Sequence, residues 1–328
     1  MGEAKKISKD GLAKLQKAFG KGSVMQLSDG AIEGVERISS GSLYLDSILG
    51  GGWPLGRIIE IYGQESSGKS STCLHLLAEA QKAGLVCGYV DMEMSFDPIY
   101  AKKLGVDTGP LLLSQPDNGE QAIDITKAMV ESGEIQVIIV DSTSTLVPKA
   151  ELEGEAGDHA VGLQARLLSK ALRMLNPLTP KHSCLIVLIS QMREKIGVTF
   201  GDPRTIGVGN ATKFYASIRV EVSKSAPTKD SSGNPIGHVM KFQTKKNKTY
   251  PPFKHSEIFF RYGEGFDKFS EIVDLATQMN IIQRAGSWYS YQDTKLGQGA
   301  EKVVELLKDN PELTEELTDQ VIKGLAQQ

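Results

Sequence analysis

The sequence predicts an α/β fold in which helices flank a mostly parallel sheet. Between residues 33 and 268, short apolar runs alternate with helical stretches, a pattern typical of parallel strands joined by crossover helices. One run leads into a glycine-rich loop that opens a helix, and another ends in an aspartate. We expect the clearest strands at residues 58–62, 85–91, 137–141, 184–190 and 218–223.

Two smaller parts flank this core of residues 33–268. Residues 1–32 contain one helical pattern after the start signal Ser8-Lys9-Asp10, with apolar residues at Leu12, Leu15, Ala18 and Phe19. A helix this short is not stable alone. We therefore expect it to pack on its own core or on a neighbouring subunit. Residues 269–328 are mostly helical but are interrupted at 286–291, which predicts a small C-terminal α+β domain.

Composition and charge fit a cytoplasmic enzyme. The 328 residues are 23% charged and 40% hydrophobic, which argues against a disordered chain and a membrane-embedded one. With a net charge of −3, any contact with nucleic acid must be a local patch. Three cysteines scattered through apolar runs argue against disulfides and zinc. The sequence shows neither a membrane-span pattern nor a signal-peptide pattern, so we expect no membrane partner.

The segment from Gly63 to Ser70 predicts a site for a nucleoside triphosphate. It reads G-x-x-x-x-G-K-S between an apolar strand and a helix, the context that a phosphate-binding loop requires. The glycines allow backbone N–H groups to surround phosphates, and the helix dipole favours their charge. Lys69 would contact the β- and γ-phosphates, and the Ser70 hydroxyl would bind Mg²⁺. A glycine-rich turn that merely precedes a helix is the alternative.

Two carboxylates supply the second half of such a site. Asp141 ends the apolar run 135–140, where an acid can hold Mg²⁺ or its water. Glu93 follows another predicted strand and could orient or deprotonate the attacking water. On spacing alone, the alternatives are an ordinary buried strand that ends in Asp and a solvated loop carboxylate.

Distinctive segments between about Leu12 and about Pro311 carry a family resemblance. They are residues 41–43, 46–57, 63–70, 96–107, 114–122, 153–155, 195–198, 209–211, 213–217 and 262–265. Their order and identity make the chain resemble a bacterial-type RecA recombinase. The resemblance implies a RecA-like P-loop ATPase core that hydrolyses ATP with Mg²⁺ in a DNA-dependent way. It also implies a helical filament on single-stranded DNA that drives homologous pairing and strand exchange.

The resemblance assigns roles around the nucleotide. Glu93 matches the catalytic carboxylate, Gln191 matches the γ-phosphate sensor, and Asp97 with Tyr100 matches the pair that contacts adenine. Ser70 and Asp141 are the implied metal ligands. The implied ATP-binding residues are Gly63, Gln64, Glu65, Ser66, Ser67, Gly68, Lys69, Ser70, Ser71, Asp97, Tyr100 and Tyr262.

Further matches concern the contact between subunits. Lys246 and Lys248 match a pair that reaches the ATP of the adjacent subunit and acts like an arginine finger. A solvated basic turn before Pro251 is the alternative. Phe214, with Lys213, matches a subunit-interface residue, and a core aromatic is its alternative.

Two segments, 153–161 and 192–209, match the loops that bind DNA along the filament axis. The second mixes glycines, cations and apolar residues, which suits a loop that gives cations to phosphates and wedges between bases. A plain mobile surface loop is the alternative. Val161 replaces an expected larger wedge and Arg204 an expected acid, which leaves the DNA spacing open. The DNA-binding candidates are Val161, Met192, Arg193, Lys195, Ile196, Gly197, Val198, Phe200, Arg204, Thr205, Gly207, Val208, Gly209 and Asn210.

The implied partners are single-stranded DNA, homologous double-stranded DNA and further copies of the chain in a head-to-tail filament. Single-strand-binding and loader proteins are further candidates. The sequence ends at Gln328 without the long acidic tail common in bacterial members, so we expect a phage-encoded or tail-trimmed member. The rival classes are a ring-forming helicase, a RadA-like branch-migration ATPase and a filament-forming scaffold that only binds ATP. Three scattered cysteines argue against the four-cysteine zinc module of a RadA-like protein.

Overall fold

A computed structural model describes residues 7–20, 23–25, 34–154, 162–194, 204–206 and 210–326. The chain forms two units, Met1–Glu36 and Arg37–Gln328. The first contains helix α1 (Lys9–Phe19), which confirms the expected N-terminal helix. The Ser8 hydroxyl caps it by accepting a hydrogen bond from the Gly11 N–H. None of the α1 residues is buried.

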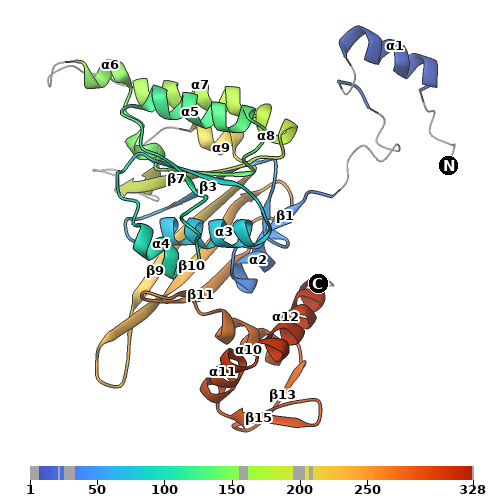
Figure 1. Ribbon diagram of the computed structural model, residues 1–328, viewed down its shortest axis with the longest axis vertical. Coiled ribbons are helices and arrows are strands. Elements are labelled where there is room, and N and C mark those ends of the chain that lie inside the picture. The colour runs from blue at the N-terminus through green and yellow to red at the C-terminus, as the bar shows by residue number, and fades with distance from the viewer. Residues whose placement is uncertain are drawn as a thin grey trace. The chain divides into compact units, whose positions relative to one another are not determined.

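The second unit is built on a ten-stranded sheet (Figure 1). Its strands are β3 (Ile58–Gly63), β4 (Cys87–Asp91), β5 (Leu112–Ser114), β6 (Val137–Asp141), β7 (Leu185–Glu194), β8 (Arg204–Ile206), β9 (Ile218–Lys229), β10 (Pro235–Asn247), β11 (His255–Arg261) and β12 (Gly265–Phe266). The order is β12-β11-β10-β9-β3-β7-β6-β4-β5, with β8 paired to β7 outside this path. From β9 to β5 all neighbours are parallel, which confirms the mostly parallel sheet.

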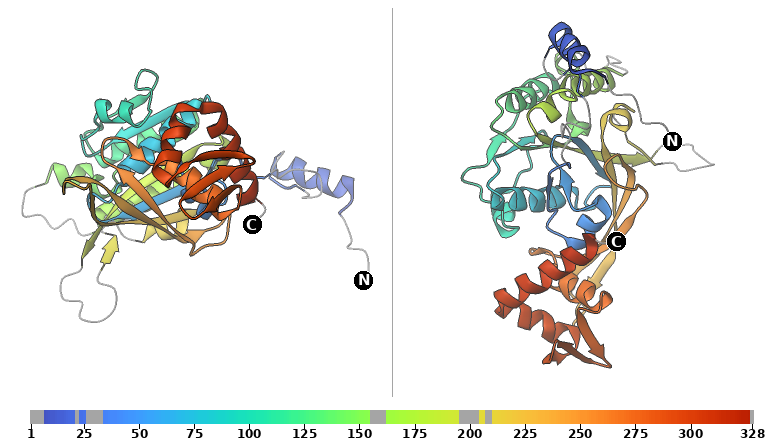
Figure 2. Two further views of the ribbon diagram at one scale, coloured as in Figure 1. Left: turned by 90° about the horizontal axis from the view of Figure 1, so that it is seen from below. Right: turned by 90° about the vertical axis from the view of Figure 1, so that its right-hand side faces the viewer.

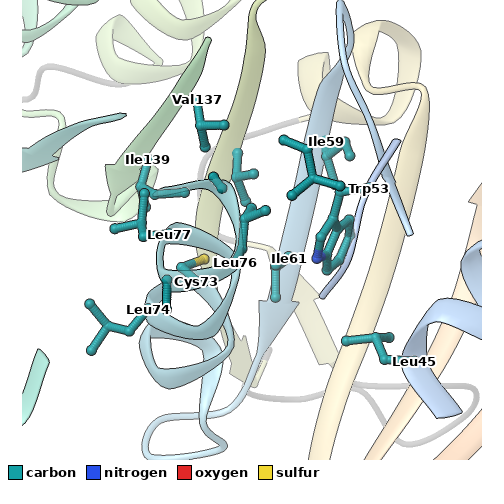
Figure 3. Packing of buried hydrophobic residues seen from close by; sticks show 14 of the residues in the cluster. Leu45, Trp53, Ile59, Ile61, Cys73, Leu74, Leu76, Leu77, Val137 and Ile139 are labelled. Carbon is teal, nitrogen blue, oxygen red and sulfur yellow. The ribbon is translucent and has the colours of Figure 1, made fainter. Parts of the chain in front are cut away.

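Helices cover both faces of the parallel part, as Figure 1 shows. The first face carries α2 (Leu43–Leu49), α3 (Lys69–Lys82) and α4 (Pro98–Lys103), and the second carries α5 (Gly119–Glu131) and α7 (Leu163–Leu175). Strand β3 serves both cores. Ile59 and Ile61 point toward α3 (Figure 3), while Ile58 belongs to the core under the second face. This double burial explains why the central strands read as nearly continuous apolar runs.

Shorter elements complete the second unit outside its C-terminal part. They are β1 (Arg37–Ile38), β2 (Trp53–Pro54), the 3₁₀ turn η2 (Thr143–Thr145), α6 (Lys149–Leu152), α8 (Leu178–Lys181) and α9 (Ala211–Tyr215). Helix α9 directly precedes β9 and packs against α7.

Strands β9 to β12 extend the sheet in antiparallel fashion, an extension that the sequence analysis did not predict. It expected β9 to end at residue 223, yet the strand continues to Lys229, where it pairs with Pro235. Most residues beyond Val222 are exposed, so no apolar pattern marks this part of the strand. Backbone pairing with β10 stabilises it instead.

The C-terminal part has its own hydrophobic core and forms a lobe beside the large sheet (Figure 2). It consists of α10 (Lys268–Gln278), β13 (Ile282–Ala285), β14 (Trp288–Tyr291), β15 (Thr294–Gln298), α11 (Ala300–Asp309) and α12 (Pro311–Ala326). The three strands form an antiparallel sheet, which confirms the expected α+β character. In the described ranges, no helix combines the length and apolar character needed to cross a membrane.

Candidate active site

The loop between β3 and α3 is shaped by two glycines. A Cβ atom on Gly63 would lie 2.1 Å from the carbonyl oxygen of Val222, so a side chain there would collide with β9. Gly68 has φ 92°, and a Cβ there would lie 2.4 Å from Cε of Met240. No side chain caps the N-terminus of α3. The first N–H groups of this helix can therefore bind an anion.

Lys69 and Ser67 show that this loop suits a phosphate ligand. The Lys69 side chain is buried, and Nζ donates hydrogen bonds to the carbonyl oxygens of Gln64 at 2.8 Å and Gly63 at 3.3 Å. Burial lowers the pKa of Lys69, and the nearby carboxylates of Asp141 and Glu93 oppose this shift. Ser67 Oγ is buried and has no hydrogen-bond partner among the described residues. A bound oxyanion would compensate both groups.

Asp141 forms a small polar cluster at the end of β6. Its Oδ2 accepts hydrogen bonds of 2.7 Å from the Ser70 hydroxyl and from the Tyr89 hydroxyl. Burial raises the pKa of Asp141, and these two hydrogen bonds oppose the rise. The described residues contain no group of three His, Cys, Asp or Glu side chains that could hold a metal alone. One carboxylate and one hydroxyl do fit Mg²⁺, which usually completes its shell with water and phosphate oxygens.

Glu93 and Gln191 meet beside this cluster. Oε1 of Glu93 accepts a hydrogen bond of 2.7 Å from Nε2 of Gln191 and one of 2.6 Å from the Ser142 hydroxyl. The backbone N–H of Gln191 donates to Oγ of Ser144 at 3.0 Å. The structure therefore brings together the predicted water-activating carboxylate and the predicted sensor.

The candidate adenine residues lie at the start of α4. Asp97 caps this helix, because its Oδ1 accepts hydrogen bonds from the N–H groups of Ile99 and Tyr100. The Tyr100 hydroxyl is 2.9 Å from Oγ of Ser71, which holds the ring beside the first turn of α3. Tyr262 lies on the turn after β11, with its ring centroid 5.5 Å from that of His238.

The candidate subunit-interface residues gather at the C-terminal end of α9. Nζ of Lys246 donates hydrogen bonds to the carbonyl oxygens of Lys213 at 2.7 Å and Phe214 at 3.1 Å. The Phe214 side chain is 74% exposed, which excludes a core role within the protomer. Lys248 is exposed just beyond the end of β10.

The candidate DNA-binding residues are only partly described. Strands β7 and β8 pair antiparallel, so the backbone of Arg193 lies opposite Thr205 and that of Glu194 opposite Arg204. Met192 lies opposite Ile206, and exposed Asn210 directly precedes α9. The candidates outside the described residues are Val161, Lys195, Ile196, Gly197, Val198, Phe200, Gly207, Val208 and Gly209.

Comparison with known protein families agrees with this arrangement. A family model described as the RecA N-terminal domain matches residues 6–267, and one described as the RecA C-terminal domain matches residues 270–326. The chain belongs to the RecA family. It is therefore a DNA-dependent ATPase that forms helical filaments on single-stranded DNA and catalyses homologous pairing and strand exchange in recombination and repair.

Individual RecA proteins are similar over most of their length. Protein RecA of Cytophaga hutchinsonii is 52% identical over 305 residues, which cover 93% of this chain and 86% of that protein. Protein RecA of Bacteroides thetaiotaomicron is 50% identical over 315 residues, which cover 96% and 95%. Protein RecA of Halalkalibacterium halodurans is 50% identical over 311 residues, which cover 94% and 89%.

The sequence analysis missed the residues that hold the RecA site side chains in place. Tyr89 binds Asp141, Ser142 binds Glu93, and Ser144 binds the backbone of Gln191. The hydroxyl-rich segment 142–145, directly after the acid of β6, was the signal that could have indicated the two serines. Nothing local indicated Tyr89, which reads as one more apolar residue of β4.

Proposed function

We propose that two protomers complete each ATPase site together, head to tail in the filament. The observation that carries this proposal is the clustering of Lys69, Asp141 and Glu93 in one place and of Lys246 with Phe214 in another. The first group can bind and activate a nucleotide. The second presents an exposed aromatic ring and cations at the surface, as a subunit contact would require.

The phosphate loop binds the nucleotide. The N–H groups at the start of α3 and Nζ of Lys69 would exchange their present surroundings for phosphate oxygens. Ser70 and Asp141 would hold Mg²⁺, and Tyr89 keeps the carboxylate of Asp141 oriented. ATP with Mg²⁺ supplies an electrophilic γ-phosphoryl group for attack by water. Tyr100, fixed by its contact with Ser71, offers a flat face to the adenine.

Glu93 and Gln191 control the attacking water. Ser142 fixes Oε1 of Glu93, and Oε2, which takes no part in that hydrogen bond, is the oxygen that accepts a proton from water. The Gln191 amide can remain on Glu93 or turn to a γ-phosphate oxygen. Gln191 lies on β7, three residues before that strand ends at Glu194. A change in the hydrogen bonding of Gln191 is therefore passed along the strand to the segment that follows it.

Lys246 and Lys248 act on the neighbouring protomer. Lys246 lies near the end of β10, bonded to the backbone of exposed Phe214 on α9, and Lys248 follows directly after the strand. Burial lowers the pKa of Lys246, and the charges of Lys248 and Arg219 lower it further. If these two cations contact the phosphates of the ATP bound to the adjacent protomer, they would stabilise the negative charge on the γ-phosphoryl group during its transfer.

The segments 153–161 and 192–209 bind single-stranded DNA in this proposal. The support is the placement of Arg193 on β7, the strand that also carries Gln191, and of Arg204 on β8, which pairs with β7. The same filament would take up homologous double-stranded DNA and accept single-strand-binding and loader proteins. Because DNA and ATP meet in the cytoplasm of a bacterial cell, we place the activity there.

Replacement of Glu93 by Gln tests the proposal. The variant keeps the size of the side chain but removes the basic oxygen, so DNA-dependent hydrolysis should fall by at least about 10²-fold. Nucleotide binding and filament assembly should survive, with slower disassembly. Loss of nucleotide binding would show instead that Glu93 is structural.

A further inference from the structure

A buried ion pair, Glu60 with Arg219, lies next to the nucleotide site but takes no direct part in the proposed hydrolysis. Glu60 is fully buried on β3, three residues before Gly63, and Arg219 lies opposite it on β9. Nε of Arg219 donates to Oε2 of Glu60, and the guanidinium lies 4.7 Å over the ring of Tyr62. Desolvation offsets the attraction within a buried ion pair, so stability alone is a weak explanation for this one.

One side of the pair leads to the nucleotide sensor. Oε1 of Glu60 accepts a hydrogen bond of 2.9 Å from the Ser190 hydroxyl, and this hydroxyl is 2.8 Å from Oγ1 of Thr143. Ser190 directly precedes Gln191 on β7, and Thr143 begins the turn after Asp141. The carboxylate of Glu60 is therefore bonded to the strand that carries the sensor.

The other side of the pair leads to the lysines of β10. Arg219 is paired with Lys246 in the register of β9 and β10. Lys246 in turn binds the last turn of α9, which carries exposed Phe214. Arg219 and Lys246 repel each other, whereas the carboxylate of Glu60 attracts both. Glu60 thus compensates the cations of this region from within the sheet.

We propose that Glu60 and Arg219 are a positioning pair that couples Gln191 in a protomer's own nucleotide site to the lysines that the protomer presents to its neighbour. The inference rests on the proposed role of Lys246 and Lys248 in the adjacent site. A displacement of β7 at Ser190 moves the carboxylate of Glu60, and the salt bridge passes this movement to β9 and β10. The two oxygens of one carboxylate thereby join the strands on either side of β3.

The substitution Glu60→Gln tests this coupling with little change in shape. The amide oxygen can still accept from Arg219 and the amide nitrogen can donate to Ser190, so the variant loses charge rather than hydrogen bonds. Full-length protein on single-stranded DNA should hydrolyse ATP at least about tenfold more slowly, with KM for ATP within about twofold of the parent. The matched control is Glu257→Gln, which removes an exposed carboxylate paired with Lys241 in the same sheet and should keep the parent rate.

Filaments that mix Glu60→Gln with a second variant then show whether Glu60 acts by presenting Lys246 and Lys248 to the neighbour or in another way. Lys69→Arg protomers offer intact lysines but a defective phosphate loop, so mixing them with Glu60→Gln protomers should restore activity. Lys246→Ala/Lys248→Ala protomers offer only a phosphate loop, so mixing them with Glu60→Gln protomers should restore none. Rescue only by Lys246→Ala/Lys248→Ala protomers, in filaments shown to contain both variants, overturns the inference because Glu60 then acts in its own site. Rescue by neither partner overturns it because Glu60→Gln then damages both the nucleotide site and the presentation of the lysines. Rescue by both overturns it as well.

Two further results complete this test. Ser190→Ala removes the hydrogen bond between the sensor strand and Glu60 but leaves the salt bridge between Glu60 and Arg219. This variant should hydrolyse ATP slowly for the same reason as Glu60→Gln, because its lysines are not presented to the neighbour. It keeps the test valid even if Glu60→Gln fails to fold. A Ser190→Ala protein that rescues Lys246→Ala/Lys248→Ala protomers fully would overturn the coupling to Gln191. Parent-level hydrolysis by Lys246→Ala/Lys248→Ala alone would overturn the proposed shared site itself, which is a different failure.

Discussion

Nε2 of Gln191 donates a 2.7 Å hydrogen bond to Oε1 of Glu93, across 98 positions of sequence. Gln191 lies on β7 and Glu93 follows the end of β4, and these two strands are separated in the sheet by β6 and its terminal Asp141. Three neighbouring parallel strands thus bring the proposed sensor Gln191, the proposed metal ligand Asp141 and the carboxylate of Glu93 to one edge. The carboxyl edge of a parallel sheet is where such folds bind their ligands.

Lys69→Ala should abolish ATP hydrolysis. The substitution removes the buried cation that now binds the carbonyl oxygens of Gly63 and Gln64 and would bind the phosphates. Steady-state hydrolysis with and without single-stranded DNA measures the loss. Lys82→Ala is the control, since Lys82 lies on the same helix but is exposed and paired with Glu79. DNA-stimulated turnover near the parent rate in Lys69→Ala would refute the phosphate-loop assignment.

Replacement of Arg193 and Arg204 by Ala should weaken binding to single-stranded DNA and flatten its dependence on salt. With fewer cations at the phosphates, binding releases fewer counterions. The negative slope of log K against log salt should therefore become shallower by roughly 0.7 for each phosphate that the variant no longer neutralises. Titration of labelled DNA at several salt concentrations gives the slope. Lys127→Ala, on α5, controls for the loss of positive charge. An unchanged slope would mean that neither arginine meets a phosphate.

Glu271 should make the attachment of the C-terminal part sensitive to pH. Its Oε2 accepts hydrogen bonds from the Ser42 hydroxyl at 2.9 Å and the Leu43 N–H at 2.7 Å, across 229 and 228 positions. Burial raises the pKa of Glu271 from 4.5 to about 8, although these hydrogen bonds oppose the rise. The folded protein therefore holds a proton that the unfolded chain releases above pH 4.5.

The sign of the pH effect follows from this difference in bound protons. The contribution of Glu271 to stability is full below pH 4.5 and decreases as pH rises to about 8, by roughly 1.4 kcal/mol per unit. Denaturant unfolding between pH 5 and 8 measures the slope. In Glu271→Gln, which keeps the shape but does not titrate, this part of the slope should vanish. The same slope in parent and variant would show that Glu271 does not carry the effect.

The sequence predicts the parallel part of the sheet because burial on both faces leaves a visible mark. Strand β3 is apolar apart from Glu60, β6 is apolar up to its final Asp141, and the loop from Gly63 to Ser70 is a local motif. Strands β10 and β11 are harder to predict, because polar residues such as Lys241 and Gln243 alternate with Phe242 and its apolar neighbours. Their pairing follows from backbone hydrogen bonds to β9 rather than from apolar content.

The partners of the site residues lie beyond the reach of a local pattern. Glu93 carries a signal as the acid after a strand, but its bonds to Ser142 and Gln191 depend on the order of strands in the sheet. The pair of Glu60 and Arg219 spans 159 positions, and each residue alone looks like an interruption of an apolar strand. Only the fold brings the two charges together.

Mixing two inactive variants tests most directly whether the active site is shared between protomers. Lys69→Arg spoils its own phosphate loop, because a broad guanidinium cannot replace a compact ammonium, but it keeps Lys246 and Lys248. Lys246→Ala/Lys248→Ala keeps its phosphate loop but has no lysines to present. Each should be nearly inactive alone on single-stranded DNA, and an equal mixture should form a complete site at roughly one interface in four. We expect hydrolysis to return to a sizeable fraction of the parent rate. A mixture as inactive as its components, although both enter the same filament, would contradict the shared site.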